Sequence, residues 1–188
     1  MLFRSDFQYY ITPSLGVHGI FSRSSFTFQS EDQTLSKLGL DAFYNLKFHS
    51  RAKFELGLGA QKISTPEIIA LDNAYPSPSY LLGNSTRFSA IAHIELQFQV
   101  DEFTQAFFRA QASKIVQFSS GAFTGGTLSG SSMPYRLSAG IRGRWLRPWG
   151  MLIEGSLDHD SYQYIAQSRA IYVSYKNLEV LTGIFYLF

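Results

Sequence analysis

Apolar and polar residues alternate along most of the 188-residue chain. A period of two is typical of β-strands with one apolar and one polar face, whereas the longer period of an amphipathic helix is hard to find here. We therefore expect a single all-β domain over residues 1–188. The alternation predicts eight strands, over residues 5–22, 34–48, 51–63, 87–100, 105–118, 134–146, 149–159 and 168–188.

The predicted connections differ in length. In an antiparallel up-and-down sheet their order places the short ones at one end, together with both termini. Transmembrane β-barrels have this asymmetry, with short periplasmic turns and longer external loops. A break near Pro13 and another near Asn177 would instead give ten strands with inverted termini, and this alternative stays open. The short connections are 49–50, 101–104 and 147–148, and the longer ones are 23–33, 64–86, 119–133 and 160–167.

Aromatic residues recur on the apolar face, ten positions apart, in three neighbouring strands. Ten residues at about 3.3 Å each, tilted by about 40°, rise about 25 Å, the height of the lipid-facing band between the aromatic girdles of a membrane barrel. Further aromatic residues gather near the short turns, as amphipathic rings do at a membrane interface. The apolar face is therefore expected to face lipid. The spaced pairs are Phe88 and Phe98, Phe108 and Phe118, and Tyr135 and Trp145; the other aromatic residues are Phe7, Tyr9, Phe48, Phe54, Trp149, Tyr186 and Phe188.

Charged residues of both signs fall on the opposite face. In a membrane barrel they would fill the lumen and pair there, because buried charges need partners. In a soluble, lipocalin-like ligand-binding barrel the same residues would form the solvated exterior. The predicted lumenal charge network consists of Lys37, Asp41, Lys53, Glu55, His93, Glu95, Arg109, Arg136, Arg142, Arg144, Glu154, Asp158 and Glu179.

Composition narrows the functional classes. Charged residues make up 16% of the chain and aromatic residues another 16%, while the mean hydropathy is near zero, so apolar residues are dispersed. The net charge is only +2, and no run of basic residues in the sequence predicts binding to nucleic acid. Cysteine is absent, which removes disulfides, thiol catalysis and cysteine-ligated metals.

The last eleven residues of the chain, LEVLTGIFYLF, put alternate apolar side chains on one face and end on an aromatic residue. This resembles the carboxy-terminal signature of outer-membrane barrels, and the strand pattern resembles the eight-stranded OmpA, OmpX and OmpW class. The resemblance implies export and insertion by the barrel-insertion machinery. It also implies a bacterial outer membrane containing lipopolysaccharide, with both termini periplasmic. Thr182 departs mildly from the signature, whose expected signal positions are Val180, Ile184, Tyr186 and Phe188.

Catalytic and metal-binding patterns are weak. His93 and Glu95 share a face and are interpreted as a lumenal hydrogen-bonded pair. His159 with Ser161 distantly resembles the catalytic set of lipid A deacylases, which keeps a lipid-modifying enzyme as an alternative. Asp158 and Asp160 flank His159 and are interpreted as an acidic turn, not a calcium site. We expect no enzyme activity, no cofactor and no metal.

Two further features point to the outer surface. Lys114 lies on the apolar face, where a lysine at the midplane would cost a few kcal/mol unless it reaches the interface. Small residues around it would let a second copy, a membrane protein or a lipid approach closely. The apolar connection 64–86 is expected to fold over the barrel mouth or to bind a partner. The predicted partner surface consists of Ala90, Ala92, Ala110, Ala112, Lys114, Ala139 and Gly143.

An eight-stranded barrel is filled by its own side chains, so a general porin is not expected. The sequence therefore predicts a closed outer-membrane barrel with a structural or interaction role.

Overall fold

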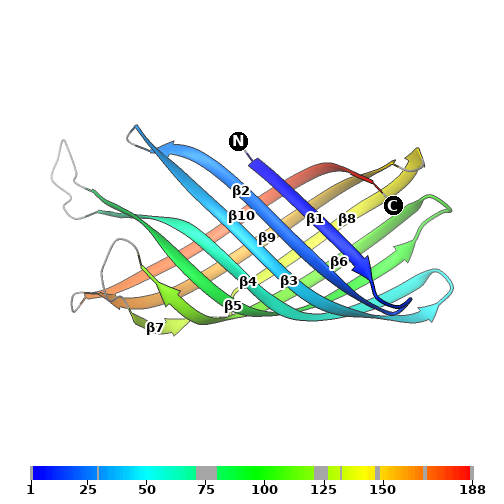
Figure 1. The fold of residues 1–188 in the computed structure, drawn as a ribbon, viewed down its shortest axis with the longest axis horizontal. Helices are drawn as coiled ribbons and strands as arrows, with labels where there is room; N and C mark the ends of the chain where they lie inside the picture. Colours follow the sequence, from blue (N-terminus) through cyan, green and yellow to red (C-terminus); the bar gives the residue numbers. More distant parts are fainter. Residues whose placement is uncertain are drawn as a thin grey trace.

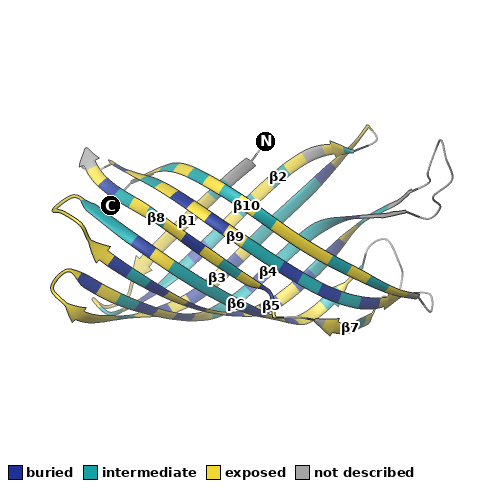
Figure 2. Ribbon diagram, turned by 180° about the vertical axis from the view of Figure 1, so that it is seen from behind, coloured by how far each residue is buried: buried dark blue, intermediate teal, exposed yellow. Residues whose placement is uncertain are grey.

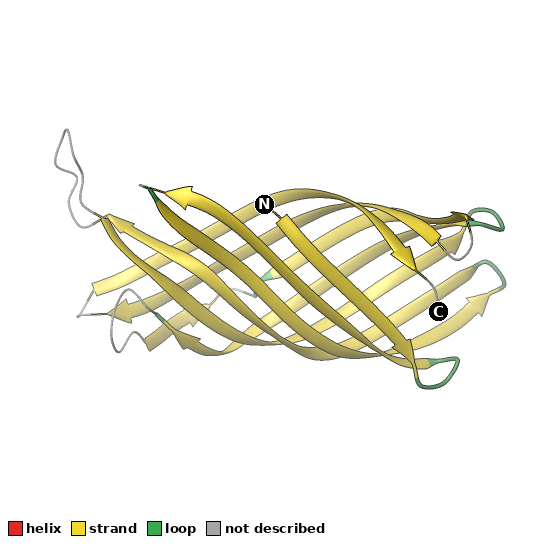
Figure 3. Ribbon diagram, turned by 45° about the horizontal axis from the view of Figure 1, so that its top comes forward, coloured by secondary structure: helices red, strands yellow, loops and turns green. Residues whose placement is uncertain are grey.

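The computed structural model describes residues 2–28, 30–70, 80–120, 127–131, 133–146, 149–166 and 169–186, all of them in strands, turns and short loops (Figures 1 and 3). Among these residues, no helix is long and apolar enough to cross a membrane. The strands are β1 (Leu2–Tyr10), β2 (Leu15–Phe28), β3 (Glu31–His49), β4 (Ala52–Ala70), β5 (Tyr80–Gln99), β6 (Thr104–Ser119), β7 (Thr127–Ser131), β8 (Tyr135–Leu146), β9 (Trp149–Ala166) and β10 (Arg169–Tyr186).

The strands form one curled antiparallel sheet in the order β1-β2-β3-β4-β5-β6-β8-β9-β10, with β7 pairing to β9 beside this path. The prediction of an all-β antiparallel fold is confirmed. The prediction of eight strands is not, because nine strands follow the main path. Nor is the sheet closed: within the described part of the chain, β1 pairs with β2 alone and β10 with β9 alone.

The extra strand arises because the expected first strand, 5–22, turns at residues 11–14. Pro13 lacks the backbone donor that a continuous strand would use. The turn is closed by Ile11 N–H and Thr12 N–H, which both donate to Leu15 O, and by Leu15 N–H, which donates to Thr12 Oγ1. The second break considered, near Asn177, does not occur, since Asn177 pairs in register with Asp158.

The early turn changes the direction of the first strand. Turns 11–14, 50–51 and 100–103 gather at one end of the sheet, called here the short-turn end (Figure 1). Strand β10 finishes at this end, with Tyr186 opposite Trp149. Strand β1 begins away from it, with Leu2 opposite Ser24. The expectation that both termini lie at the short-turn end is therefore wrong for β1.

The expected long connections are mostly strand. Residues 64–70 pair with 80–86, so the connection 64–86 is a hairpin extension, and only 71–79 lie outside the described residues. Strands β2 and β3 extend into 23–33, where Ser30 has a φ of 66°. Similarly, β9 and β10 extend into 160–167, and β7 lies within 119–133. The expected folding of 64–86 over a barrel mouth falls on residues 71–79 and on neighbouring side chains, which lie outside the described residues.

Burial alternates along the strands, as Figure 2 shows, and defines two faces. The concave face carries the buried side chains, including Phe43, Phe107 and Glu55. The convex face carries large exposed apolar side chains such as Leu58, which is 71% exposed, and Ile153, which is 55% exposed. The apolar face of the predicted pattern is thus the outside of the curled sheet, and the charged face is the inside.

One predicted aromatic pair is wrong. Phe88 and Phe98 are both exposed on the convex face, as expected. A bulge at Val116, where the register between β5 and β6 shifts, reverses the phase of the following residues. Phe118 therefore packs on the concave face, with its ring centroid 4.9 Å from that of Tyr164. Of the third pair, Tyr135 is exposed on the convex face, and the side chain of Trp145 lies outside the described residues.

We predict that Asp101 stabilises the turn between β5 and β6 in a pH-dependent way. Its Oδ1 accepts hydrogen bonds from the backbone N–H groups of Phe103 and Thr104, both at 2.8 Å. The bond from Phe103 is the main cause that lowers the pKa of Asp101 below its usual value. The stabilisation is therefore complete above the unfolded pKa of about 4 and is lost as the pH falls through the lower folded value.

The substitution Asp101→Asn should lower the urea midpoint, measured by tryptophan fluorescence, at pH 6 and should lower it less at pH 2. Glu102→Gln, in the same exposed turn, is the matched control and should have no effect at either pH. A deficit for Asp101→Asn of the same size at pH 2 and pH 6 would contradict this role.

Candidate functional site

The concave face holds a chain of histidines and carboxylates that crosses four strands. His18 Nδ1 of β2 lies 3.0 Å from Asp41 Oδ1 of β3, and the other oxygen of Asp41 lies 3.2 Å from His93 Nδ1 of β5. His93 Nε2 in turn lies 3.1 Å from Glu55 Oε1 of β4. Asp41, Glu55 and His93 are all buried. His18 is therefore held by one carboxylate and His93 by two, all of them from other strands.

Glu95 extends this chain towards β6 and β8. Its two oxygens accept hydrogen bonds from Arg109 Nε and from an Arg142 guanidinium nitrogen, each at 2.6 Å, and Gln97 donates a third at 2.8 Å. Arg109 also lies 3.7 Å from Glu55, which joins the two parts. Glu95 is fully buried, so these donors replace the water that an ionised carboxylate would otherwise need.

A second cluster centres on Arg136 of β8. Its guanidinium group lies 3.3 to 3.4 Å from oxygens of Glu154, Asp158 and Glu179, which come from β9 and β10. Arg4 of β1 lies 3.5 Å from Glu154. Side chains of both edge strands thus meet in one cluster, although β1 and β10 share no backbone pairing in the described chain.

A third cluster lies further from the short-turn end. Arg87 of β5 pairs with Asp160 of β9 and donates to Thr65 Oγ1 at 3.2 Å. Its guanidinium carbon lies 4.8 Å from the ring centroid of Tyr162. The rings of Tyr162, Tyr164 and Phe118 pack beside it, so this end of the concave face is filled by aromatic side chains.

The structure brings ten of the thirteen expected network residues into these clusters. Lys37 lies on the concave face beside a small cavity of about 20 Å³ that Asp41 and Arg136 also line. Lys53 and Arg144 are exposed at the short-turn end and form no ion pair with the described residues. The ten joined residues are Asp41, Glu55, His93, Glu95, Arg109, Arg136, Arg142, Glu154, Asp158 and Glu179.

Sequence reasoning missed four members of the clusters: Arg4, His18, Arg87 and Asp160. Their period-two phase was a usable signal. Arg87, for example, shares the odd phase of His93 and Glu95 on β5. Asp160 was assigned to a turn because the ninth strand was expected to end too early.

The other chemical candidates do not converge. Asp158 faces Arg136, Asp160 faces Arg87, and His159 lies on the convex face with its ring 5.2 Å from that of Tyr135. His93 contacts Asp41 and Glu55, whereas Glu95 contacts the arginines. Within the described residues, no group of three or more histidine, aspartate or glutamate side chains is arranged so that it could hold a metal ion.

The convex face has its own pattern. Four basic side chains, called here the basic row, lie at a similar distance from the short-turn end. Lys62 lies ten residues along β4 from Ala52, and Lys114 lies ten residues along β6 from Thr104. Lys176 lies ten residues along β10 from Tyr186, and Arg23 lies eight residues along β2 from Leu15. All four are exposed on the convex face. Between this basic row and the short turns, no described side chain that points outwards carries a charge.

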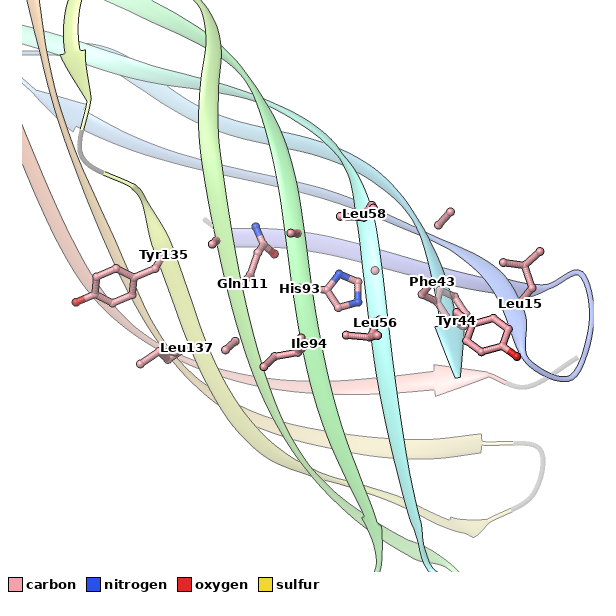
Figure 4. A pocket seen from close by; sticks show the side chains of 15 residues that line it. Leu15, Phe43, Tyr44, Leu56, Leu58, His93, Ile94, Gln111, Tyr135 and Leu137 are labelled. Carbon is pink, nitrogen blue, oxygen red and sulfur yellow. The ribbon is translucent and has the colours of Figure 1, made fainter. Parts of the chain in front are cut away.

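The expected partner surface is partly a groove. A cavity of about 770 Å³ opens on the convex face of strands β2 to β6 and β8 (Figure 4). Ala92, Ala110 and Ala112 are among the residues that line it. Ala90 and Lys114 lie just beyond these residues along β5 and β6. Ala139 is exposed outside the groove, and neither it nor Gly143 lines it.

The expected insertion signal lies on the outer side of the edge strand. Val180 and Ile184 are 72% and 74% exposed on β10. The side chains of Tyr186 and Phe188 lie outside the described residues.

No family model matches this chain, and no curated protein matches it in sequence.

We predict that the position of the His93 ring requires glycine at residue 57. The two residues are directly paired between β4 and β5, and a Cβ atom at Gly57 would lie 2.1 Å from the His93 ring. The substitution Gly57→Ala should displace the ring from Asp41 and Glu55 and destabilise the fold by about 1–3 kcal/mol. The free energy of unfolding in urea measures this.

Gly155→Ala is the matched control, because a Cβ atom at Gly155 has no neighbour within 4 Å. It should leave stability unchanged or raise it by up to about 1 kcal/mol, since alanine loses less backbone entropy than glycine. Equal effects of the two substitutions would show that the position of His93 does not depend on Gly57.

Proposed function

We propose that this chain is a membrane-embedded β-barrel protein of the bacterial outer membrane with a structural or interaction role. The observation that carries the proposal is the convex face. Between the basic row and the short turns, the described outward side chains are uncharged on every strand of the main path, and many large apolar ones among them are exposed. A soluble protein has no reason to expose such a continuous apolar surface, whereas lipid requires it.

The height of the apolar band supports this proposal. Ten residues of a tilted strand rise about 25 Å, which matches the apolar band of outer-membrane barrels. The basic row lies at the limit of that band, where lysine side chains can reach the headgroups. Phe98 and Trp149, exposed near the short turns, suit the opposite interface.

The position of the charges supports the same proposal. The soluble ligand-binding alternative needs its charged face outside, but the charges pair on the concave face. In a barrel this face becomes the lumen, and the cavity of about 20 Å³ beside Lys37 has room for roughly one water molecule. A lumen filled in this way does not let solutes diffuse through freely. We therefore assign the function to the outer surface and the loops.

The proposal requires the sheet edges to be covered in the bilayer. Unpaired backbone groups in lipid cost several kcal/mol each, so membrane sheets are closed. The contact between Arg4 and Glu154 already links β1 to β9 on the concave side. We propose that in the membrane the edges of β1 and β10 are covered by each other or by a further strand.

The resemblance of the carboxy-terminal strand to the outer-membrane signature supports insertion by the barrel-insertion machinery. The exposed apolar side chains of Val180 and Ile184 on β10 suit this recognition, because they lie on the outer side of an edge strand. The short turns would then face the periplasm, and the extended hairpins would face outwards.

A charge introduced on the convex face tests the proposal through its dependence on depth. Ile94→Arg places a guanidinium group about five residues from the short turn, near the midplane of the proposed band. After refolding into lipid vesicles, it should destabilise the protein by about 2–4 kcal/mol, measured by urea unfolding.

Asn84→Arg is the control on the same strand and face, beyond the level of the basic row, and should cost about 0–1 kcal/mol. If Ile94→Arg and Asn84→Arg are equally mild, or if the chain folds in water without detergent or lipid, the membrane proposal is wrong.

A further inference from the structure

The groove on the convex face is almost entirely apolar and has small residues at its centre. Ala92 of β5 and Ala110 and Ala112 of β6 form the floor. Larger side chains, including Leu58 on one side and Tyr135 and Leu137 on the other, form the walls (Figure 4). Its volume of about 770 Å³ falls in the range of about 300–1,000 Å³ that is usual for small-molecule sites.

Two lysines lie beyond the end of the groove that is furthest from the short turns. Neither lines the groove: on β4, Lys62 is four residues past the lining residue Leu58. Lys114 lies directly across from Ala90 and two residues beyond Ala112 on β6. Lys62 lies across from Phe88 on the other side of β5. With strands about 4.8 Å apart and an offset of two residues, or about 7 Å, along β5, the backbones of the two lysines lie about 12 Å apart on either side of this strand. Both are exposed, and neither forms an ion pair with the described residues.

This arrangement places two cationic side chains beyond the outer end of an apolar groove. The groove lies within the proposed lipid-facing band, and the lysines lie at its outer boundary. A bound molecule must therefore place apolar chains along Ala92 and Ala112 and negative charge beside Lys62 and Lys114. A protein partner that covered the groove would have to bury both lysines or supply carboxylates to them, whereas the phosphates of a lipid already lie at that level.

We propose that the groove, with Lys62 and Lys114, is a binding site for a phosphorylated acylated glycolipid of the lipid A type. This inference rests on the proposed membrane location and orientation, since the extended hairpins would put the lysines at the external leaflet. Acyl chains lie against the alanine floor, and phosphate oxygens accept hydrogen bonds from the two ammonium groups. The third lysine of the basic row, Lys176 on β10, lies away from the groove and takes no part.

The site can be tested by native mass spectrometry of the full chain, refolded in detergent micelles and titrated with purified lipid A. The double substitution Lys62→Ala with Lys114→Ala should weaken binding by at least about tenfold, because it removes two charge-assisted contacts. Ala92→Phe, which fills the groove and keeps both lysines, should also weaken binding. Lys176→Ala is the matched control at the same depth and should bind as the unmodified chain does.

Two further ligands identify the group that is recognised. Dephosphorylated lipid A should bind weakly to the unmodified chain and should be insensitive to the double substitution. Phosphatidylglycerol should bind more weakly than lipid A. Equal binding of phosphatidylglycerol with the same dependence on Lys62 and Lys114 would overturn the assignment to a glycolipid.

Failure of this inference can be told apart from failure of the proposed function. A chain that refolds in micelles but binds lipid A equally well in all variants, or not at all, overturns the site and leaves the membrane location standing. A chain that does not fold in micelles and is stable in water overturns the proposed function itself.

Discussion

The pairing of charges on the concave face is the interaction on which the rest of the structure depends. Glu95 is fully buried and is held by Arg109, Arg142 and Gln97, and Arg136 joins three carboxylates from two strands. Removing one partner from such a group leaves an uncompensated buried charge at a cost of about 3–5 kcal/mol. The networks therefore link strands distant in sequence and fix which face of each strand is inside.

Once the charged side chains are inside, period-two alternation places the remaining residues outside. The convex face then carries alanine, leucine and aromatic side chains up to a row of basic residues. The same separation explains the two candidate sites: the concave networks stabilise the fold, and the groove below Lys62 and Lys114 offers a surface for binding. On this account, the protein functions through the convex face of the sheet.

The sequence predicted the strands, the two faces and most of the charge network, because all three follow from alternation along the chain. It predicted less well the events that interrupt alternation: the break near Pro13 was only an alternative, and the bulge at Val116 was not expected. The turn at Pro13 adds a strand, and the bulge at Val116 moves Phe118 from the convex to the concave face. The partners of Arg87 and His18 depend on the register between strands, which the alternation along a single sequence does not specify. The groove depends on the curvature of six strands, so only its alanines were visible in advance.

The most direct test is a lipid-accessibility scan along β5 in vesicles. The natural chain has no cysteine, so single cysteines at positions 88–98 can each carry one spin label. Collisions with oxygen, which partitions into lipid, should be frequent at even positions and rare at odd positions, and collisions with a water-soluble nickel complex should stay low at even positions up to Phe88. Frequent nickel collisions at Ala92, Ile94 and Leu96 would place the convex face in water and contradict the account.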